Sequence, residues 1–433
     1  MTRQNTEQEP LSRESTVYDA LSEKSRTFLS NIKSNLKDIK ESSFALVLSI
    51  ITGILAGVFL GKTEETLLLI PGLIVLVPAA MGMRGSIGGA LGSRLSTALH
   101  LGTIDKFSLN DKVVRINVFS SIMLSFFLSI FLAFVAKFMT GIFGLKSISL
   151  FSFIVISTVG GVLAGLILAL MTVITAFVAY RRNMDLDNIQ APIITALGDL
   201  FTIPCLLLAA FVVQSYGFYV DSLSLIILVV GLVSIWYILL RKEDAKKSKE
   251  SYRAIIFQSA LILACVGLIE GVVGTLLESK IDVLTTLPIL LVLFPVFLEE
   301  GGNIGNTLAS RISTKLHLGT LDTDLRIGGE IKKEFFISYF LSLVVFPLTG
   351  LLVYVFSFAF GIQLIPIGEL VVITSMAGLV LTTVIIIATF LIALLSYKFG
   401  FDPDNTTIPV VTAVADILGV LSLLVVLGAF HIL

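Results

Sequence analysis

The sequence has few charged residues and few of the side chains that bind metals or cross-link a chain. Asp, Glu, Lys and Arg make up 14% of its 433 residues, whereas a soluble domain contains about 25%. Its two cysteines, Cys205 and Cys265, lie in apolar runs and form neither a disulfide framework nor a metal-binding spacing. A net charge of −1 provides no basic surface for nucleic acid. These shortages argue against a soluble multidomain protein, a disulfide scaffold and a nucleic-acid-binding protein.

Long apolar runs dominate the sequence instead, and 56% of its residues are hydrophobic. A transmembrane helix needs about 20 mostly apolar residues. The sequence predicts eleven such spans: 44–61, 67–102, 115–142, 150–180, 189–215, 222–241, 254–277, 285–319, 333–360, 366–398 and 406–431. The second and the eighth are too long for a simple crossing, so we expect them to tilt, break or extend beyond the membrane. The fold class is therefore an all-α polytopic membrane protein whose main partner is the lipid bilayer.

The distribution of Lys and Arg predicts the orientation of these spans. The polar segment 1–43 contains seven Lys and Arg residues, shows no signal-peptide pattern, and has an apolar helical stripe typical of a membrane-surface helix. Lys and Arg also concentrate in the loops after the even-numbered spans, whereas the other loops contain only Lys62, Lys137, Lys146 and Lys280. Because cytoplasmic loops are enriched in these residues, we predict a multi-pass protein of the cell membrane with a cytoplasmic N-terminus and an external C-terminus.

The chain repeats itself with an offset of 217 residues. Residues 87–105 and 304–322 read IGGALGSRLSTALHLGTID and IGNTLASRISTKLHLGTLD, which are identical at 13 of 19 positions. Residues 185–199 and 402–416 match in the same register. Shared apolar composition does not explain matched Arg, His, Pro and Asp, so the sequence indicates a duplication.

This duplication predicts the domain organisation. We expect a cytoplasmic tail at 1–43, a first five-span repeat at 44–215, a linker span with a basic loop at 216–253, and a second five-span repeat at 254–433. The linker span returns the chain to its starting side. The two five-helix repeats should therefore be parallel and related by a pseudo-twofold axis along the membrane normal, like a fused dimer around one central pathway.

Matched acidic residues are predicted inside the fifth and eleventh spans. Each lies on a helix face with a Pro, a Thr and an Asn; the two sets are Asn188, Pro192, Thr195 and Asp199, and Asn405, Pro409, Thr412 and Asp416. An ionisable side chain within a membrane generally marks a pathway or a partner. Two carboxylates that face each other across an axis favour a cation, and hydrated Mg²⁺ suits a site with few carboxylates. The alternative is that each carboxylate bonds a neighbouring helix.

Other polar residues have two interpretations. Asp185, Asp187, Asp402 and Asp404 precede the same spans, where they either cap helices or form an acidic mouth or a regulatory ion site. In the second and eighth spans, small and polar residues recur along one face and either pack helices closely or line a hydrated pathway. We assign Ser86, Asn303 and Asn306 to the lining.

The two halves differ in charge at several matched positions, four of which lie well inside the predicted spans. Glu299 and Glu300 match Gly82 and Met83, Arg84 matches Gly301, and Glu270 matches Gly53. We predict that Arg84 pairs with Glu300, or with Glu299, across the axis. Otherwise Glu299 and Glu300 are additional metal ligands. The sequence assigns no role to Glu270.

The motifs resemble a known family. PVFLEEGGNIGNTLASRIST (295–314) and DPDNTTIPVVTAVADILG (402–419) resemble the membrane domain of MgtE magnesium channels. The pattern of two five-span units and a linker is most similar to the fused-duplicate relatives, the solute carrier family 41 divalent-cation transporters. The resemblance implies transport of Mg²⁺ as substrate, no organic cofactor, and a monomeric pathway. It also implies that Asp199 and Asp416 are the pore acids and that Asn303 and Asn306 match the Asn of the Gly-Asn motif.

Three other functions remain open at this point. The first is a divalent-cation exchanger coupled to Na⁺ or H⁺. The second is an intramembrane aspartyl protease that uses Asp199 and Asp416 as a dyad. The third is a membrane sensor that carries no flux.

Overall fold

The computed structural model describes residues 36–100, 104, 111–181, 186–240, 252–317, 321, 328–398 and 403–432. Residues 48–433 form one compact unit, and residues 1–47 are a separate one. The described elements are the helices α2 (Leu36–Gly61), α3 (Glu64–Leu69), α4 (Leu73–His100), α5 (Lys112–Ile142), α6 (Leu150–Arg181), α7 (Leu186–Ser215), η1 (Gly217–Tyr219), α8 (Val220–Leu240), α9 (Tyr252–Glu278), α10 (Ile281–Thr286), α11 (Pro288–His317), α12 (Gly329–Ala359), α13 (Ile367–Lys398) and α14 (Pro403–Ala429).

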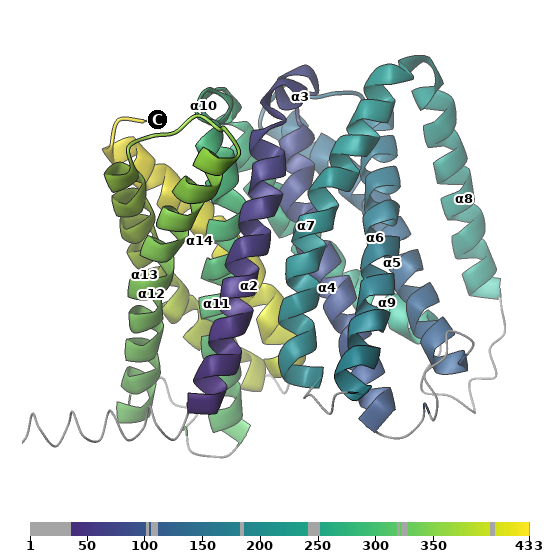
Figure 1. Cartoon of the computed structure of the whole chain (residues 1–433). Coiled ribbons are helices and arrows are strands. Elements are labelled where there is room, and N and C mark those ends of the chain that lie inside the picture. The colour runs from purple at the N-terminus through teal and green to yellow at the C-terminus, as the bar shows by residue number, and fades with distance from the viewer. Residues whose placement is uncertain are drawn as a thin grey trace, which may run out of the picture. The chain divides into compact units, whose positions relative to one another are not determined.

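Ten helices in the described part of the chain are long and apolar enough to cross a membrane. They correspond to the second to eleventh predicted spans, and the larger unit is a bundle of these helices (Figure 1). The first predicted span, 44–61, lies in α2. There the described side chains begin at Ser49, and Ser49–Gly61 is a shorter apolar helix. The prediction of an all-helical multi-pass protein is therefore confirmed, whereas the crossing by 44–61 remains a prediction.

The two overlong spans are broken near their beginnings. The second divides into α3 and α4 at Pro71 and Gly72, and the eighth divides into α10 and α11 before Pro288. Gly72 has a φ of +87°, which glycine adopts readily because it has no Cβ. Its N–H donates to Oε1 of Glu278 at 2.8 Å. The short helices α3 and α10 pack together at one end of the bundle (Figure 1).

Equivalent residues build equivalent cores in the two halves. A cluster of α4, α5 and α6 contains Leu91, Leu95, Leu99, Val173 and Ala176. A second cluster contains their counterparts 217 residues later, which are Leu308, Ile312, Leu316, Phe390 and Ala393. A larger core includes residues of both halves. The duplication thus extends from the motifs to the packing.

The first helix of each half packs against the second long helix of the other half. Gly57 on α2 contacts the carbonyl oxygen of Val292 on α11. Its counterpart Gly274 on α9 contacts the carbonyl oxygen of Val75 on α4. Glycine permits this backbone approach because it has no side chain, as is common between membrane helices. The halves are therefore joined by an exchange of helices.

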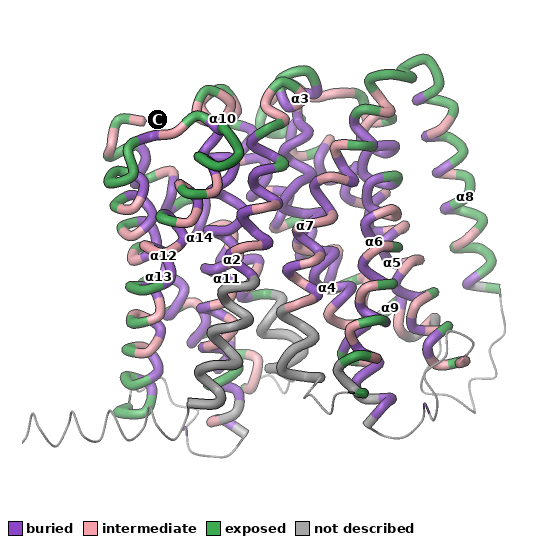
Figure 2. The backbone as a smooth tube through the Cα atoms, viewed as in Figure 1, coloured by how far each residue is buried: buried purple, intermediate pink, exposed green. Residues whose placement is uncertain are grey.

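The linker helix α8 lies at the edge of the bundle and packs mainly on α6 (Figure 1). Only 22% of its most apolar window is buried within the protein. Its exposed side chains include Leu232, Val233 and Trp236, and most of the helix is coloured as exposed in Figure 2. A helix that is apolar on all sides and scarcely buried by protein is suited to contact lipid.

Candidate cation site

The two predicted pore acids lie on helices that pack closely against α4 and α11. Asp199 on α7 is 6% exposed, and Asp416 on α14 is half-buried. Small residues bring the helices together, because a Cβ added at Gly85 would lie 3.2 Å from Cγ2 of Thr195. The equivalent Cβ at Gly302 would lie 3.7 Å from Cγ2 of Thr412. The carboxyl groups of Asp199 and Asp416 are close enough to interact electrostatically.

Two glutamates join this pair from two further helices. Glu270 on α9 lies close enough to Asp416 and Asp199 to interact electrostatically with both. Glu299 on α11 interacts electrostatically with both aspartates. Sequence reasoning listed Glu299 as a candidate ligand and left Glu270 without a role. The repeat already indicated a role for Glu270. An acid within a span, where the other half has the matched residue Gly53, is costly unless it has a function.

Each glutamate lies against a glycine of the other half. A Cβ at Gly82 would be 3.4 Å from Oε1 of Glu270, and a Cβ at Gly53 would be 2.6 Å from Oε2 of Glu299. Gly53 and Gly82 are themselves the counterparts of Glu270 and Glu299. The second half therefore supplies both glutamates, and the first half supplies the space that they occupy. Both oxygens are buried without a hydrogen-bond partner.

Glu300 belongs to a neighbouring hydrogen-bonded group. Ser49 donates to its Oε1 at 2.9 Å, and Asn303 donates to the same oxygen at 3.3 Å and to Ser49 Oγ at 3.0 Å. Its Oε2 is buried without a partner. Asn303 thus orients an acid that interacts electrostatically with Glu299.

The remaining predicted lining residues have different surroundings. Asn306 donates to Oγ1 of Thr412 at 2.9 Å, which links the two motifs of the second half. In the first half, Gly89 stands where Asn306 does and has open space around its Cα. Ser86 is half-buried on α4. Some of the small and polar residues of α4 and α11 therefore pack against other helices, and others, such as Gly89, border open space.

Several predicted residues cannot be placed. Asp185 and Asp402 lie outside the described residues. Asp187, Asn188, Asp404 and Asn405 lie in the first turns of α7 and α14, where the structure does not describe side chains. The acidic mouth remains a prediction.

The predicted pair of Arg84 with Glu300 or Glu299 is not formed. Arg84 points into the first half, where its Nη2 donates to Oγ of Ser129 on α5 at 2.7 Å. The reason is local space, because Gly161 on α6 opens a niche that the guanidinium fills. Arg84 is 1% exposed and has no carboxylate partner among the described side chains.

The charge of the acid cluster is also uncompensated by protein. Within the described residues, Asp199, Asp416, Glu270 and Glu299 form no ion pair with Lys or Arg. Buried like charges repel each other strongly unless a cation or a proton intervenes. Among the described side chains, no three His, Cys, Asp or Glu residues are arranged to hold one metal ion directly. Such a cluster can attract a cation through its combined charge.

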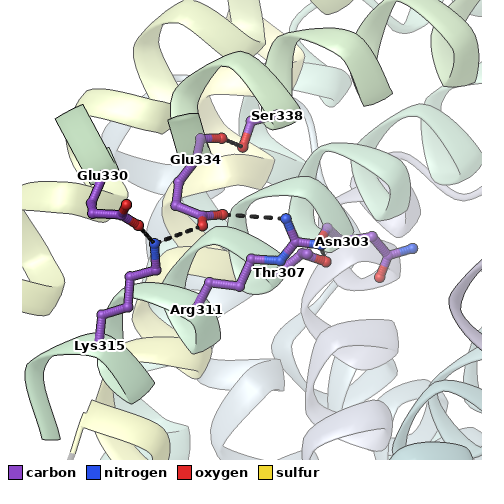
Figure 3. A network of polar contacts seen from close by, with 7 residues as sticks. All are labelled: Asn303, Thr307, Arg311, Lys315, Glu330, Glu334 and Ser338. Carbon is purple, nitrogen blue, oxygen red and sulfur yellow. Dashed lines mark hydrogen bonds and ion pairs between the residues drawn. The ribbon is translucent and has the colours of Figure 1, made fainter. Parts of the chain in front are cut away.

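At the end of α11, the second half neutralises its own charges (Figure 3). Glu334 on α12 is 8% exposed at its side chain and lies 3.2 Å from Arg311 and 3.0 Å from Lys315. Lys315 also contacts Glu330 at 2.6 Å. Burial alone would lower the pKa of Lys315, but the hydrogen bonds to Glu330 and Glu334 outweigh it and raise the pKa above its ordinary value. Lys315 therefore stays charged at neutral pH.

Replacing Glu334 should destabilise the protein. In Glu334→Gln, Arg311 and Lys315 lose the buried carboxylate between them, and we expect a loss of about 1–2 kcal/mol. The measurement is the apparent melting temperature of the purified protein in detergent. The control is Glu330→Gln, which should have no measurable effect because Glu330 is exposed. Equal effects of the two substitutions would contradict this account.

Comparison with known proteins identifies the family. The profile of the MgtE family, described as divalent cation transporters, matches residues 77–209 and 294–426, which together make up more than half of the chain. Each boundary of the second match lies 217 residues after the corresponding boundary of the first. The chain therefore belongs to the MgtE family of divalent cation transporters and contains the family's domain twice. Because this is a family of transporters, the protease alternative is excluded.

Solute carrier family 41 proteins are similar to this chain. The chain is 26% identical to member 2 of Xenopus laevis over 453 residues, which cover 93% of this chain and 74% of that protein. It is 25% identical to member 3 of Rattus norvegicus over 368 residues, or 80% of this chain and 77% of that protein. Human member 2 is 26% identical over 372 residues, and the match covers 62% of its length. No solved structure matches the chain.

Proposed function

We propose that this protein moves Mg²⁺ across the cell membrane through a central pathway between its two repeats. The supporting observation is the convergence of Asp199, Asp416, Glu270 and Glu299 from four helices, without a basic partner among the described side chains. A divalent cation relieves the mutual repulsion of these carboxylates. Mg²⁺ loses its water reluctantly, so a hydrated ion that contacts one or two carboxylates at a time suits such a pathway.

The polar residues around the acids contact the ion's water shell in this proposal. They are Thr195 and Thr412, Asn303 and Asn306, Ser86 and, nearer the cytoplasm, Asn188 and Asn405. Asp185, Asp187, Asp402 and Asp404 form an acidic mouth that concentrates cations. Glu300, which accepts a hydrogen bond from Asn303, adds negative charge near the pathway in this proposal.

The architecture supports a single pathway per chain. The matched contacts of Gly57 with Val292 and of Gly274 with Val75 agree with a pseudo-twofold axis between parallel repeats. We place that axis along the membrane normal, with the N-terminus in the cytoplasm and the C-terminus outside. In this arrangement the repeats are 44–215 and 254–433, residues 216–253 connect them, and residues 1–43 are the cytoplasmic tail. The protein then acts as a fused pseudo-dimer.

The geometry also makes the pathway asymmetric. The aspartates are contributed equally by the two halves, whereas Glu270, Glu299 and Glu300 all come from the second. Added carboxylates strengthen the attraction for a divalent over a monovalent cation, since the interaction scales with ionic charge. Glu270 and Glu299 therefore favour divalent selectivity.

Mg²⁺ influx into liposomes tests the proposal. The purified full chain is reconstituted into sealed liposomes that contain a magnesium-sensitive dye, and protein-free liposomes are the control. An inside-negative potential should accelerate influx through a channel, because each unit charge gains about 2.3 kcal/mol per 100 mV. Dependence on an opposing Na⁺ or pH gradient would instead indicate the coupled exchanger.

Selectivity follows from the same assay when Mn²⁺, Co²⁺ or Zn²⁺ competes with Mg²⁺. Reconstituted protein that is shown to be folded, yet moves no divalent cation under any gradient, would overturn the proposal. The non-transporting sensor would then be the better description.

A further inference from the structure

A cavity in the first half is lined by a buried arginine that has no carboxylate partner among the described side chains. The cavity lies among α4, α5 and α6, and its lining includes Arg84, Ser121, Ser125 and Gly165. Its volume is about 10 Å³, the space of one water-sized sphere. Of the three guanidinium nitrogens of Arg84, Nη2 bonds Ser129, while Nε and Nη1 are buried without any hydrogen-bond partner. A donor pair is thus left unsatisfied beside an empty space.

The charges around this cavity are all positive. Among the described side chains, the ionisable neighbour that interacts electrostatically with Arg84 is Cys205, a thiol. Arg94 contacts the lining residue Ser121: its Nη2 lies 3.5 Å from Oγ of Ser121, and its Nε donates to Oδ1 of Asn117 at 2.7 Å. The neutral Asn117 occupies the position of Glu334, which neutralises Arg311 in the second half. Arg84 therefore lines the cavity and Arg94 contacts its lining, and neither forms an ion pair with a carboxylate among the described side chains.

The second half closes the equivalent space with its own side chains. Thr382 stands where Gly165 does, and its hydroxyl donates to Oγ of Ser342, the counterpart of Ser125, at 2.8 Å. Phe346 replaces Ser129 and packs against Gly378, the counterpart of Gly161. In the second half, a hydrogen bond between two hydroxyl groups and an aromatic ring thus occupy the space that corresponds to the cavity of the first half.

We propose that the cavity beside Arg84 binds a small monovalent anion such as chloride. The unsatisfied Nε–H and Nη1–H of Arg84 donate to the anion, and the Ser125 hydroxyl, which faces the same space, completes its surroundings. An anion stabilises the protein here, because a buried guanidinium without a counterion is costly within a membrane. The cavity is too small for a phosphate or a lipid headgroup, and a chloride, which is larger than water, enters with a small displacement of the lining side chains. This site is independent of the cation pathway, since Arg84 lies on the side of α4 that faces α5 and α6.

Binding of ³⁶Cl⁻ to the purified full chain in detergent tests the proposal directly. The wild type should bind one saturable chloride per chain, and its apparent melting temperature should be higher in sodium chloride than in sodium gluconate of equal ionic strength. Arg84→Met should lose the bound chloride and the difference between the two salts. It should also be more stable than the wild type in gluconate, because it removes the uncompensated charge.

Two further variants separate the site from general effects of the substitution. Gly165→Thr introduces the residue of the second half, fills the cavity while Arg84 is retained, and should weaken chloride binding at least tenfold. Ser342→Ala, at the matched position of the other half, should leave chloride binding unchanged. If the wild type binds no chloride and the two salts give the same stability, water fills the cavity and the proposal is wrong. Chloride binding that persists in a folded Arg84→Met protein would overturn it as well.

Discussion

Liposomes containing the Asp199→Asn/Asp416→Asn double variant should take up Mg²⁺ no faster than protein-free liposomes. Asparagine keeps the size of the side chain and one acceptor oxygen, replaces the other oxygen with an NH₂ donor, and removes the charge. A hydrogen bond to a charged group contributes about 1.5–3 kcal/mol. Removal of both charges should therefore reduce influx by about 100-fold or more. The measurement is the initial rate of the dye signal at equal amounts of reconstituted protein.

The single variants and a matched control make this result specific. Asp199→Asn and Asp416→Asn should each reduce influx less than the double variant, because the other aspartate and the two glutamates remain. Asp221→Asn removes an exposed carboxylate on α8 and should leave influx unchanged. Influx at the wild-type rate in the folded double variant would show that the ion does not pass these carboxylates.

The sequence predicted the parts of this site that occur twice. Duplicated residues can be recognised from one sequence, since the offset of 217 pairs Asp199 with Asp416 and Thr195 with Thr412. The hydrophobic runs predicted the helices because lipid imposes a minimum length on each crossing. The same length rule indicated that the second and eighth spans must be irregular, and the structure has the short helices α3 and α10 there.

Residues that occur only once were harder to interpret. The carboxyl group of Glu270 lies against Gly82 on α4, and these two residues are far apart in the sequence. The predicted pairing of Arg84 with Glu300 was wrong. Complementary charge predicts an attraction, but it does not predict on which side of its helix the Arg84 side chain lies. Gly161 and Ser129 offer the guanidinium a niche on the opposite side of α4, and only the packing of α5 and α6 reveals it.

The exchange of the first helices between the two halves could not be predicted from the sequence either. The repeat predicts that α2 and α9 are equivalent, yet equivalence does not say which half each helix packs against. The contacts of Gly57 and Gly274 decide this, and they place Glu270 and Glu299 beside glycines of the opposite half. The helix exchange thus assembles the acid cluster from both repeats.

Substitution of Gly274 by alanine should therefore destabilise the protein severely. The new Cβ would overlap the carbonyl oxygen of Val75 and lie 2.7 Å from its Cα. Backbone atoms within a helix cannot move aside as a side chain can, so α9 and α4 must separate. Overpacking of this kind costs about 1–3 kcal/mol or more, and we expect a value near the upper limit. The apparent melting temperature in detergent, with the yield of folded protein, measures the effect.

The duplication supplies a second test, and an open glycine supplies the control. Gly57→Ala should destabilise the protein as much as Gly274→Ala, because its Cβ would lie 2.7 Å from the Cα of Val292. Gly141→Ala places the same methyl group on α5, where nothing lies within 4 Å. It should be neutral or stabilising by up to about 1 kcal/mol, since alanine favours the helix. If both interface variants melted like Gly141→Ala, the close contact between the halves would be refuted. A strong effect of only one of them would show that the two exchanged helices do not contribute equally.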